Sequence, residues 1–237
     1  MNERRRRIFF VIFLALLAFG LSFINNTIPQ TAVAPEVKDV LGTTNQTLHS
    51  ASEALDQLEV KGRAPKTGYK RAQFGDGWEK LVGCDTRNYI LKRDLTDIVT
   101  RSATDCTVVS GVLNDPYTGK VINFVRGADT SDDVQIDHVV ALSDAWQKGA
   151  QGLSMDERVL LANDGLNLLA VDGKTNQAKS DSDSASWLPP SKPHRCQYVA
   201  RQIAVKQKYK LWVTASEKDA INRVLSDCPD QKLPVVS

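Results

Sequence analysis

Histidine is scarce in this sequence, and closely spaced cysteines are absent. The chain has three histidines and four cysteines among its 237 residues. No two cysteines form a Cys-x-x-Cys pair, which argues against a zinc ribbon. Each histidine that lies in an apolar segment therefore needs an explanation of its own.

A strong net charge is also missing. The formal charge of the whole chain is +2. Residues 1–24 alone carry +3, so the remainder of the chain carries −1. Such a near-neutral balance does not by itself require a polyanionic partner. A role on nucleic acid would need a local basic surface and a metal.

The N-terminus contains the one long apolar run. Residues 1–7 read MNERRRR, and residues 8–24 follow with Ser22 as their only polar side chain. This run is longer than the roughly 7–15 residues of a signal peptide and shorter than the about 20 that span a bilayer. Ala32-Val33-Ala34 offers a cleavage site, but it begins eight residues after the run ends. We favour an uncleaved membrane anchor with the arginines inside, and a signal peptide is the alternative.

Either interpretation of residues 1–24 predicts that the rest of the chain is exported, as an extracellular protein or one held on the outer face of the cell membrane. An even number of cysteines outside the cytosol indicates two disulfides. Four cysteines allow three pairings, and free buried cysteines are the alternative to all of them. We favour the two local pairings, Cys84–Cys106 and Cys196–Cys228, because each bond would then stabilise one end of the domain.

Composition divides the chain into residues 1–24, a linker over 25–52, a globular domain over 53–228 and a tail over 229–237. Apolar spacing predicts helices over 47–60, 88–99, 153–164 and 194–210. In the third of these helices we expect Met155, Val159, Leu160 and Ala162 to pack inward. Alternating apolar residues around a turn sequence predict a hairpin over 108–125.

The centre of the domain holds the chemically interesting residues. VQIDHVVAL, residues 134–142, is typical of a strand, and it places Asp137 and His138 within an apolar run. Burying two ionisable groups costs several kcal/mol, on the order of 2–7 for a polar group, unless they are paired. A second strand over 165–173 contains Asn167, and a helix or helical turn that follows contains Asn176. The order is therefore strand, helical insertion, strand and helix.

This arrangement resembles the HNH endonucleases, also called ββα-metal or His-Me-finger nucleases, and most closely the small exported bacterial members. The resemblance covers roughly residues 53–228, with GCDTR, DPYTG, IDHVVAL, NDGLNLLAV, NQAKSD, WLPP and the cysteine positions. It implies an α+β fold in which a ββα-metal core lies in a small mixed domain with flanking helices. The last motif position is Asn176 rather than histidine, a variant that active members also have.

The resemblance and the residue chemistry together imply a metal-dependent hydrolysis of phosphodiester bonds. His138 would be the general base, because its unperturbed pKa of about 6.5 leaves much of it neutral near pH 7. Asp137 and Asn176 would hold a divalent ion through oxygen atoms, which suits Mg²⁺, with Mn²⁺ or another divalent ion as alternatives. Asn167 would hold the intervening loop by side-chain to backbone hydrogen bonds. An ideal strand sends Asp137 and His138 to opposite faces, and the family brings them together by a bend.

Each of these roles has a structural alternative. His138 could be a satisfied core histidine, and Asn176 could be a helix N-cap. Lys179, Arg87 and Arg195 are candidates for phosphate contacts. The alternatives are that Lys179 is only solvated and that Arg87 forms a structural ion pair. His194 lies outside the motif, and we assign it to the surface.

A basic helix supplies the predicted nucleic-acid surface. No acidic residue lies between Ala185 and Ser216, and six basic residues do: Lys192, Arg195, Arg201, Lys206, Lys208 and Lys210. The alternative is an ordinary solvated face.

We expect a nuclease that cuts mainly DNA, with RNA as a second substrate, with low sequence specificity and 5′-phosphate and 3′-hydroxyl products. The membrane is a partner if the N-terminal segment is uncleaved, and no protein partner can be inferred. The alternative is a non-catalytic, membrane-tethered binding protein of the cell envelope that retains the fold.

Overall fold

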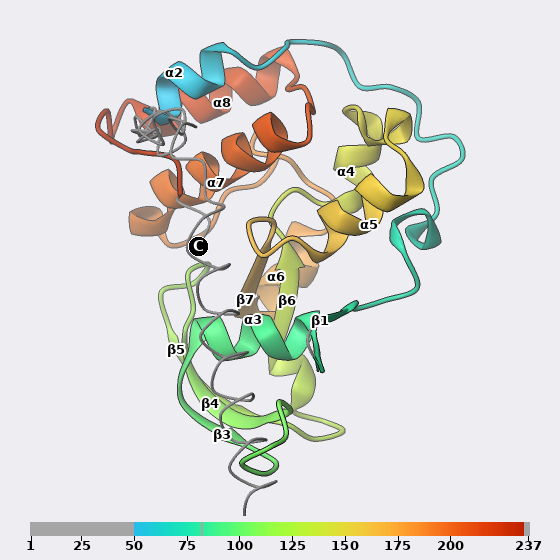
Figure 1. The fold of residues 1–237 in the computed structure, drawn as a ribbon. Helices are drawn as coiled ribbons and strands as arrows, with labels where there is room; N and C mark the ends of the chain where they lie inside the picture. The colour runs from blue at the N-terminus through green and yellow to red at the C-terminus, as the bar shows by residue number, and fades with distance from the viewer. Residues whose placement is uncertain (1–49, 82, 235–237) are drawn as a thin grey trace, which may run out of the picture. The chain divides into compact units, whose positions relative to one another are not determined.

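The computed structural model describes residues 50–81 and 83–234. The predicted anchor or signal peptide, most of the predicted linker, and His49 lie outside these residues. Within the described part of the chain, no helix is both long and apolar enough to cross a membrane. The described residues mix helices with three small antiparallel sheets, which agrees with the predicted α+β class (Figure 1).

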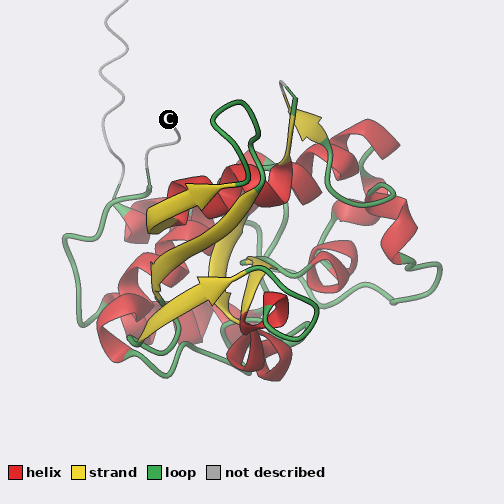
Figure 2. Cartoon of the chain, turned by 90° about the horizontal axis from the view of Figure 1, so that it is seen from below, coloured by secondary structure: helices red, strands yellow, loops and turns green. Residues whose placement is uncertain are grey.

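Three strands form an antiparallel sheet in the order β3-β4-β5 (Figure 2). Their bounds are Leu95–Thr100, Val108–Asn114 and Val121–Val125. The predicted hairpin over 108–125 is therefore confirmed. Its turn is organised by Asp115, whose carboxylate accepts hydrogen bonds from the backbone N–H groups of Tyr117 and Thr118. Tyr117 is thereby fixed at the turn with its side chain buried.

The helix predicted over 88–99 is only half right. Helix α3, Thr86–Asp94, begins behind the N-cap Asp85, and the chain changes to strand β3 at Leu95. Strand β3 contains the β-branched residues that favour a pleated surface, and it pairs with β4. Leu95 packs inward from a strand, because pairing with β4 overrides the helical spacing.

The centre of the fold is a two-stranded antiparallel ladder followed at once by a helix. Strand β6, Val134–His138, pairs with β7, Leu168–Asp172, and His138 lies opposite Leu168. Helix α6, Gly173–Lys179, starts directly after β7 with Asp172 as its N-cap. An added Cβ at Gly173 would lie 1.8 Å from the carbonyl oxygen of Asp132, so this close approach requires glycine. The predicted order of strand, insertion, strand and helix is present.

The insertion between β6 and β7 holds helices α4, Leu142–Gln147, and α5, Met155–Asn163. The predicted helix over 153–164 is confirmed, and a capping box of Ser154 and Glu157 begins it. Its predicted inward face is partly wrong. Met155 and Leu160 are 46% and 63% exposed, whereas Leu161 and Ala162 are buried. The helix is short and packs along a narrow stripe.

Helices α2, Ala51–Asp56, α7, Arg195–Lys208, and α8, Ala215–Leu225, pack together at one end of the domain (Figure 1). The predicted helices over 47–60 and 194–210 correspond to α2 and α7. The remaining short elements are two strands and four 3₁₀ helices: η2 Arg71–Phe74, β1 Lys80–Leu81, β2 Cys84–Asp85, η3 Ser131–Asp133, η4 Ala150–Gly152 and η5 Lys192–His194.

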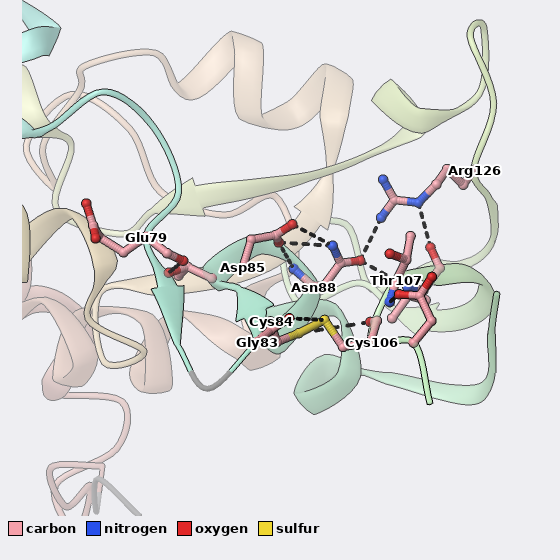
Figure 3. The surroundings of a disulfide bond; sticks show 11 residues. Glu79, Gly83, Cys84, Asp85, Asn88, Cys106, Thr107 and Arg126 are labelled. Atoms are coloured by element: carbon pink, nitrogen blue, oxygen red, sulfur yellow. Dashed lines mark hydrogen bonds between the residues drawn. A yellow bond between two sulfur atoms is a disulfide. The ribbon is translucent and has the colours of Figure 1, made fainter. Parts of the chain in front are cut away.

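Both predicted cysteine pairs are disulfide-bonded. Cys84–Cys106 closes a separation of 22 residues, and Cys196–Cys228 closes one of 32. Figure 3 shows the first bond beside Asn88, which receives hydrogen bonds from Arg126 and from the backbone of Val108. The bond joins strand β2, just before α3, to the loop that precedes β4.

Candidate active site around His138

The two faces of β6 separate the predicted site residues. Side chains alternate along a strand, so Gln135 and Asp137 point to one face and Ile136 and His138 to the other. The contacts follow this rule. Asp137 meets Tyr117 and Lys179, whereas His138 meets Trp78 and Ala162. The bend that would bring Asp137 and His138 to one phosphate is not present within β6.

The imidazole of His138 is held by two contacts on two sides. Its Nε2 lies 2.9 Å from the carbonyl oxygen of Ala162, and its ring stacks on Trp78 with 5.7 Å between centroids and 13° between planes. A carbonyl oxygen only accepts hydrogen bonds, so Nε2 carries the proton. Nδ1 has no hydrogen-bond partner within residues 50–81 and 83–234. The neutral ring therefore presents an unprotonated nitrogen.

Burial keeps this imidazole neutral. His138 is 7% exposed. Desolvation lowers its pKa to about 3, an effect that the hydrogen bond to Ala162 opposes and that the positive charges of Arg71 and Lys179 reinforce. A neutral imidazole is the form that can accept a proton, but a pKa this low makes it a weak base for as long as the ring stays buried.

A small cavity of about 60 Å³ borders the imidazole. Residues from two segments line it: Arg71, Phe74, Gly75, Gly77 and Trp78 from the segment over 71–78, and Leu142 and Ala162 from the insertion. A water molecule occupies about 30 Å³ of liquid, so the cavity has room for water but not for a nucleotide. The residues 71–78, hereafter the cover segment, would have to shift for a phosphate to reach Nδ1.

Asp137 is surrounded by partners on the opposite face. Tyr117 donates to it at 2.5 Å, and the buried ammonium of Lys179 lies 3.0 Å from its carboxylate oxygens. Burial raises the pKa of Asp137, while Lys179 and the hydrogen bond from Tyr117 act against that rise. Burial and the neighbouring Asp137 also raise the pKa of Tyr117 well above its usual value. Lys179 donates in addition to the carbonyl oxygen of His138, which ties α6 to the end of β6.

The predicted metal ligands do not form an open ion site in this conformation. Asn176 uses its amide nitrogen to donate to Gln135 at 2.9 Å. Both oxygens of Asp137 already have partners, and one of those partners is a cation, which would repel a divalent ion. Within the described residues, no group of three or more histidine, cysteine, aspartate or glutamate side chains could hold a metal. The arrangement therefore does not fit a divalent ion unless Lys179 moves.

Asn167 makes the side-chain to backbone hydrogen bonds that its predicted role requires. It is completely buried, and its side-chain oxygen accepts from the N–H of Val140 at 2.8 Å. Its amide nitrogen donates to the carbonyl oxygens of Val140 and Leu161, each at 3.3 Å. These bonds fasten the loop after β6 to the end of α5, the helix that also carries Ala162. Asn167 thus fixes the backbone on two sides of His138.

The three predicted phosphate contacts are all engaged within the protein. Lys179 is buried against Asp137. Arg87 donates to the carbonyl oxygens of Ser131 and Val134, and Arg195 donates to that of Pro189. None of the three presents an uncommitted charge at the cavity beside His138.

The predicted basic surface over 192–210 is confirmed only in part: Lys192, Lys208 and Lys210 are exposed, whereas other cations of the helix turn inward. Lys206 is completely buried and forms an ion pair with Glu217 at 3.0 Å. Arg201 donates to backbone carbonyl oxygens of residues 165, 166 and 168. Lys208 forms an ion pair with Asp164 at 2.7 Å. A stretch without acidic residues therefore does not guarantee free cations, because partners for Lys206 and Lys208 come from other elements.

Three residues of the site were missed from the sequence. Trp78 and Arg71 come from the cover segment, which is far from the motif in sequence. Tyr117 lies in a turn sequence that predicted only the hairpin. Two glycines with positive φ, Gly75 at 94° and Gly77 at 135°, mark the cover segment as a specific turn. The glycine-rich stretch FGDGW was the available signal, but it does not show which residue the tryptophan would meet.

Comparison with known proteins gives two matches. Residues 85–224 match the family described as GmrSD restriction endonucleases, C-terminal domain. An uncharacterized secreted protein of Arthroderma benhamiae is 37% identical over 182 residues, which covers 76% of this chain and 85% of that protein. No solved structure matches the chain. The predicted resemblance to an endonuclease family is confirmed by the first match.

Proposed function

Because this chain belongs to the family of GmrSD restriction endonuclease C-terminal domains, we propose that it is an exported nuclease that hydrolyses phosphodiester bonds of nucleic acid, mainly DNA. The two disulfides support export, and so does the description of the Arthroderma relative as a secreted protein. No base-reading module was found in the sequence, so the proposed cleavage has low sequence specificity.

The observation that carries this proposal is the state of His138. Its Nε2–H is bound to Ala162, its ring is aligned by Trp78, its remaining nitrogen is unprotonated, and the residue lines a cavity of about 60 Å³. The arrangement is that of a general base held ready in one tautomer.

In the proposed reaction, Nδ1 of His138 takes a proton from a water molecule as the water oxygen attacks phosphorus. The new P–O bond forms as the bond to the 3′ oxygen breaks, and the leaving oxygen takes up a proton from solvent. The products are a 5′-phosphate and a 3′-hydroxyl. The fold contributes the tautomer and the ring position, through Ala162, Trp78 and the loop held by Asn167.

The role of a divalent metal stays a prediction. A carboxylate and an amide oxygen are suitable ligands for Mg²⁺. Asp137 and Asn176 are nevertheless bound to Lys179, Tyr117 and Gln135 in the structure, so we assign no step of the reaction to a metal.

A plasmid-nicking assay on the oxidised protein tests the proposal. The wild-type protein should convert supercoiled plasmid to nicked circles, and His138→Ala should lower the rate by about 10²–10⁴-fold. His194→Ala is the matched control, since this histidine bonds to Ser191 outside the site and should leave the rate unchanged. Adding EDTA to each reaction tests the predicted metal. Wild-type protein that leaves the plasmid intact with Mg²⁺ or Mn²⁺ would favour the non-catalytic binding protein instead.

A further inference from the structure

The proposed reaction needs positive charge at the phosphate, whether or not a metal also supplies it. Negative charge builds up on the phosphate oxygens as water attacks, and a fixed donor aimed at that charge is commonly the largest contribution to catalysis. Lys179 is paired with Asp137, and Arg87 and Arg195 donate to backbone carbonyl oxygens away from the residues that line the His138 cavity. The residue that meets this need has to come from elsewhere in the fold.

Arg71 is the cationic side chain that borders the His138 cavity. It is the first residue of η2 in the cover segment, and its side chain is exposed. Its guanidinium forms no hydrogen bond or ion pair with any residue of the described chain. An arginine without a partner keeps all of its donors for a ligand, and its planar fork matches two oxygens of a phosphate.

The backbone that carries Arg71 is held firmly although its side chain is not. Phe74, three residues later, is 2% exposed and packs edge-on against Trp146 with 6.4 Å between ring centroids. Arg158 of α5 donates to the backbone carbonyl of Gln73 at 2.9 Å and to its side-chain oxygen at 3.2 Å. These anchors place the start of η2 at the rim of the cavity.

The positive charge of Arg71 also acts on His138. Arg71 and His138 line the same cavity, and the charge of Arg71 is among the influences that lower the pKa of His138. The neighbouring Lys66 is committed to Asp181 at 2.9 Å. Lys70 is exposed but does not border the cavity.

We propose that Arg71 binds the scissile phosphate of the nucleic-acid backbone, opposite the water that His138 activates. This inference rests on the proposed function for the position of the reacting group. It assigns a substrate contact that the sequence did not indicate, and it places that contact on the cover segment. The ligand is a phosphodiester anion, so the contact is independent of base sequence.

The test compares Arg71→Ala and Arg71→Lys with the matched control Lys70→Ala, which removes the same charge one residue away. On DNA and on bis(4-nitrophenyl) phosphate, Arg71→Ala should lower kcat/KM by about 10²–10³-fold, as the loss of one charge-stabilising donor does. Arg71→Lys should restore part of that loss, and Lys70→Ala should stay within about threefold of wild type. All three variants should keep the wild-type melting temperature, because both side chains are exposed.

A binding measurement separates this inference from the proposed function. Fluorescence anisotropy of a labelled oligonucleotide is measured with His138→Ala, alone and combined with Arg71→Ala or Lys70→Ala. The Arg71→Ala combination should bind more weakly than the Lys70→Ala combination. If wild-type protein cleaves and Arg71→Ala cleaves as well as Lys70→Ala, the inference about Arg71 is wrong while the nuclease stands. If wild-type protein does not cleave, the nuclease proposal fails, and equal binding by the two combinations would then overturn the phosphate contact too.

Discussion

Asp137 and His138 are neighbours in sequence, yet the two faces of β6 give them opposite surroundings. On one face, every strong interaction of Asp137 is satisfied by Tyr117 and Lys179. On the other face, His138 keeps one nitrogen without a partner beside a cavity. The comparison indicates that Asp137 stabilises the fold by pairing with Lys179, whereas His138 has a nitrogen that can still accept a proton. Substitutions on the two faces should therefore fail in different ways.

The largest expected effect is a loss of stability on the Asp137 face. Asp137→Ala leaves the completely buried Lys179 ammonium without its carboxylate. Removing one partner of a buried ion pair typically costs about 3–5 kcal/mol in the free energy of unfolding. Urea denaturation measures this cost. Adding Lys179→Met should recover part of it, and a double variant no more stable than Asp137→Ala would contradict the explanation by unpaired charge.

The two disulfides provide a second comparison, because Cys84–Cys106 lies close in sequence to Trp78, whereas Cys196–Cys228 joins α7 to the segment after α8. Each bond should contribute about 3–4 kcal/mol in the chain-entropy model, given loops of 22 and 32 residues. Replacing either pair by alanines should lower the melting temperature. Loss of Cys84–Cys106, which lies six residues beyond Trp78, should also reduce cleavage at temperatures where the protein stays folded. Equal cleavage by the two pair variants under those conditions would show that this bond does not support the His138 face.

The two asparagines of the motif provide the next contrast. Asn167→Ala removes three hydrogen bonds in a fully buried position and should cost about 1–3 kcal/mol of stability. Asn176→Ala removes one half-buried bond to Gln135 and should cost about 0.5–1.5 kcal/mol. Chemical denaturation of both variants checks the order. A reversed order would mean that Asn176 contributes more than its single described bond to Gln135.

The smallest expected effect concerns Trp78. An aromatic pair contributes about 0.5–1.5 kcal/mol, so Trp78→Ala should lower kcat by about two- to tenfold through loss of ring alignment. Trp78→Phe keeps a stacking surface and should lose less. Turnover of a small phosphodiester measures both variants. A faster Trp78→Ala protein would instead show that the tryptophan obstructs access to His138.

Much of the local structure followed from short sequence patterns. The hairpin around Asp115, the helix at Met155–Asn163 and the order β6, β7, α6 were all predicted. These elements depend on apolar spacing, turn residues and caps that act over a few positions. Strand β3 was missed, since Leu95–Thr100 is a strand only because β4 pairs with it.

The sequence by itself determined the cysteine pairs we favoured, the strand–strand–helix order and the isolated Asp-His pair. Only the tertiary structure decided which charges stay available. Lys179 lies 42 positions from Asp137 yet pairs with it, and Lys206 is buried against Glu217 from another helix. Arg71, by contrast, lines the His138 cavity and has no hydrogen-bond or ion-pair partner among the residues that the structure describes. The physical reason is that a buried charge must find an opposite charge wherever the fold places one, and that choice depends on distances in space that local patterns do not encode.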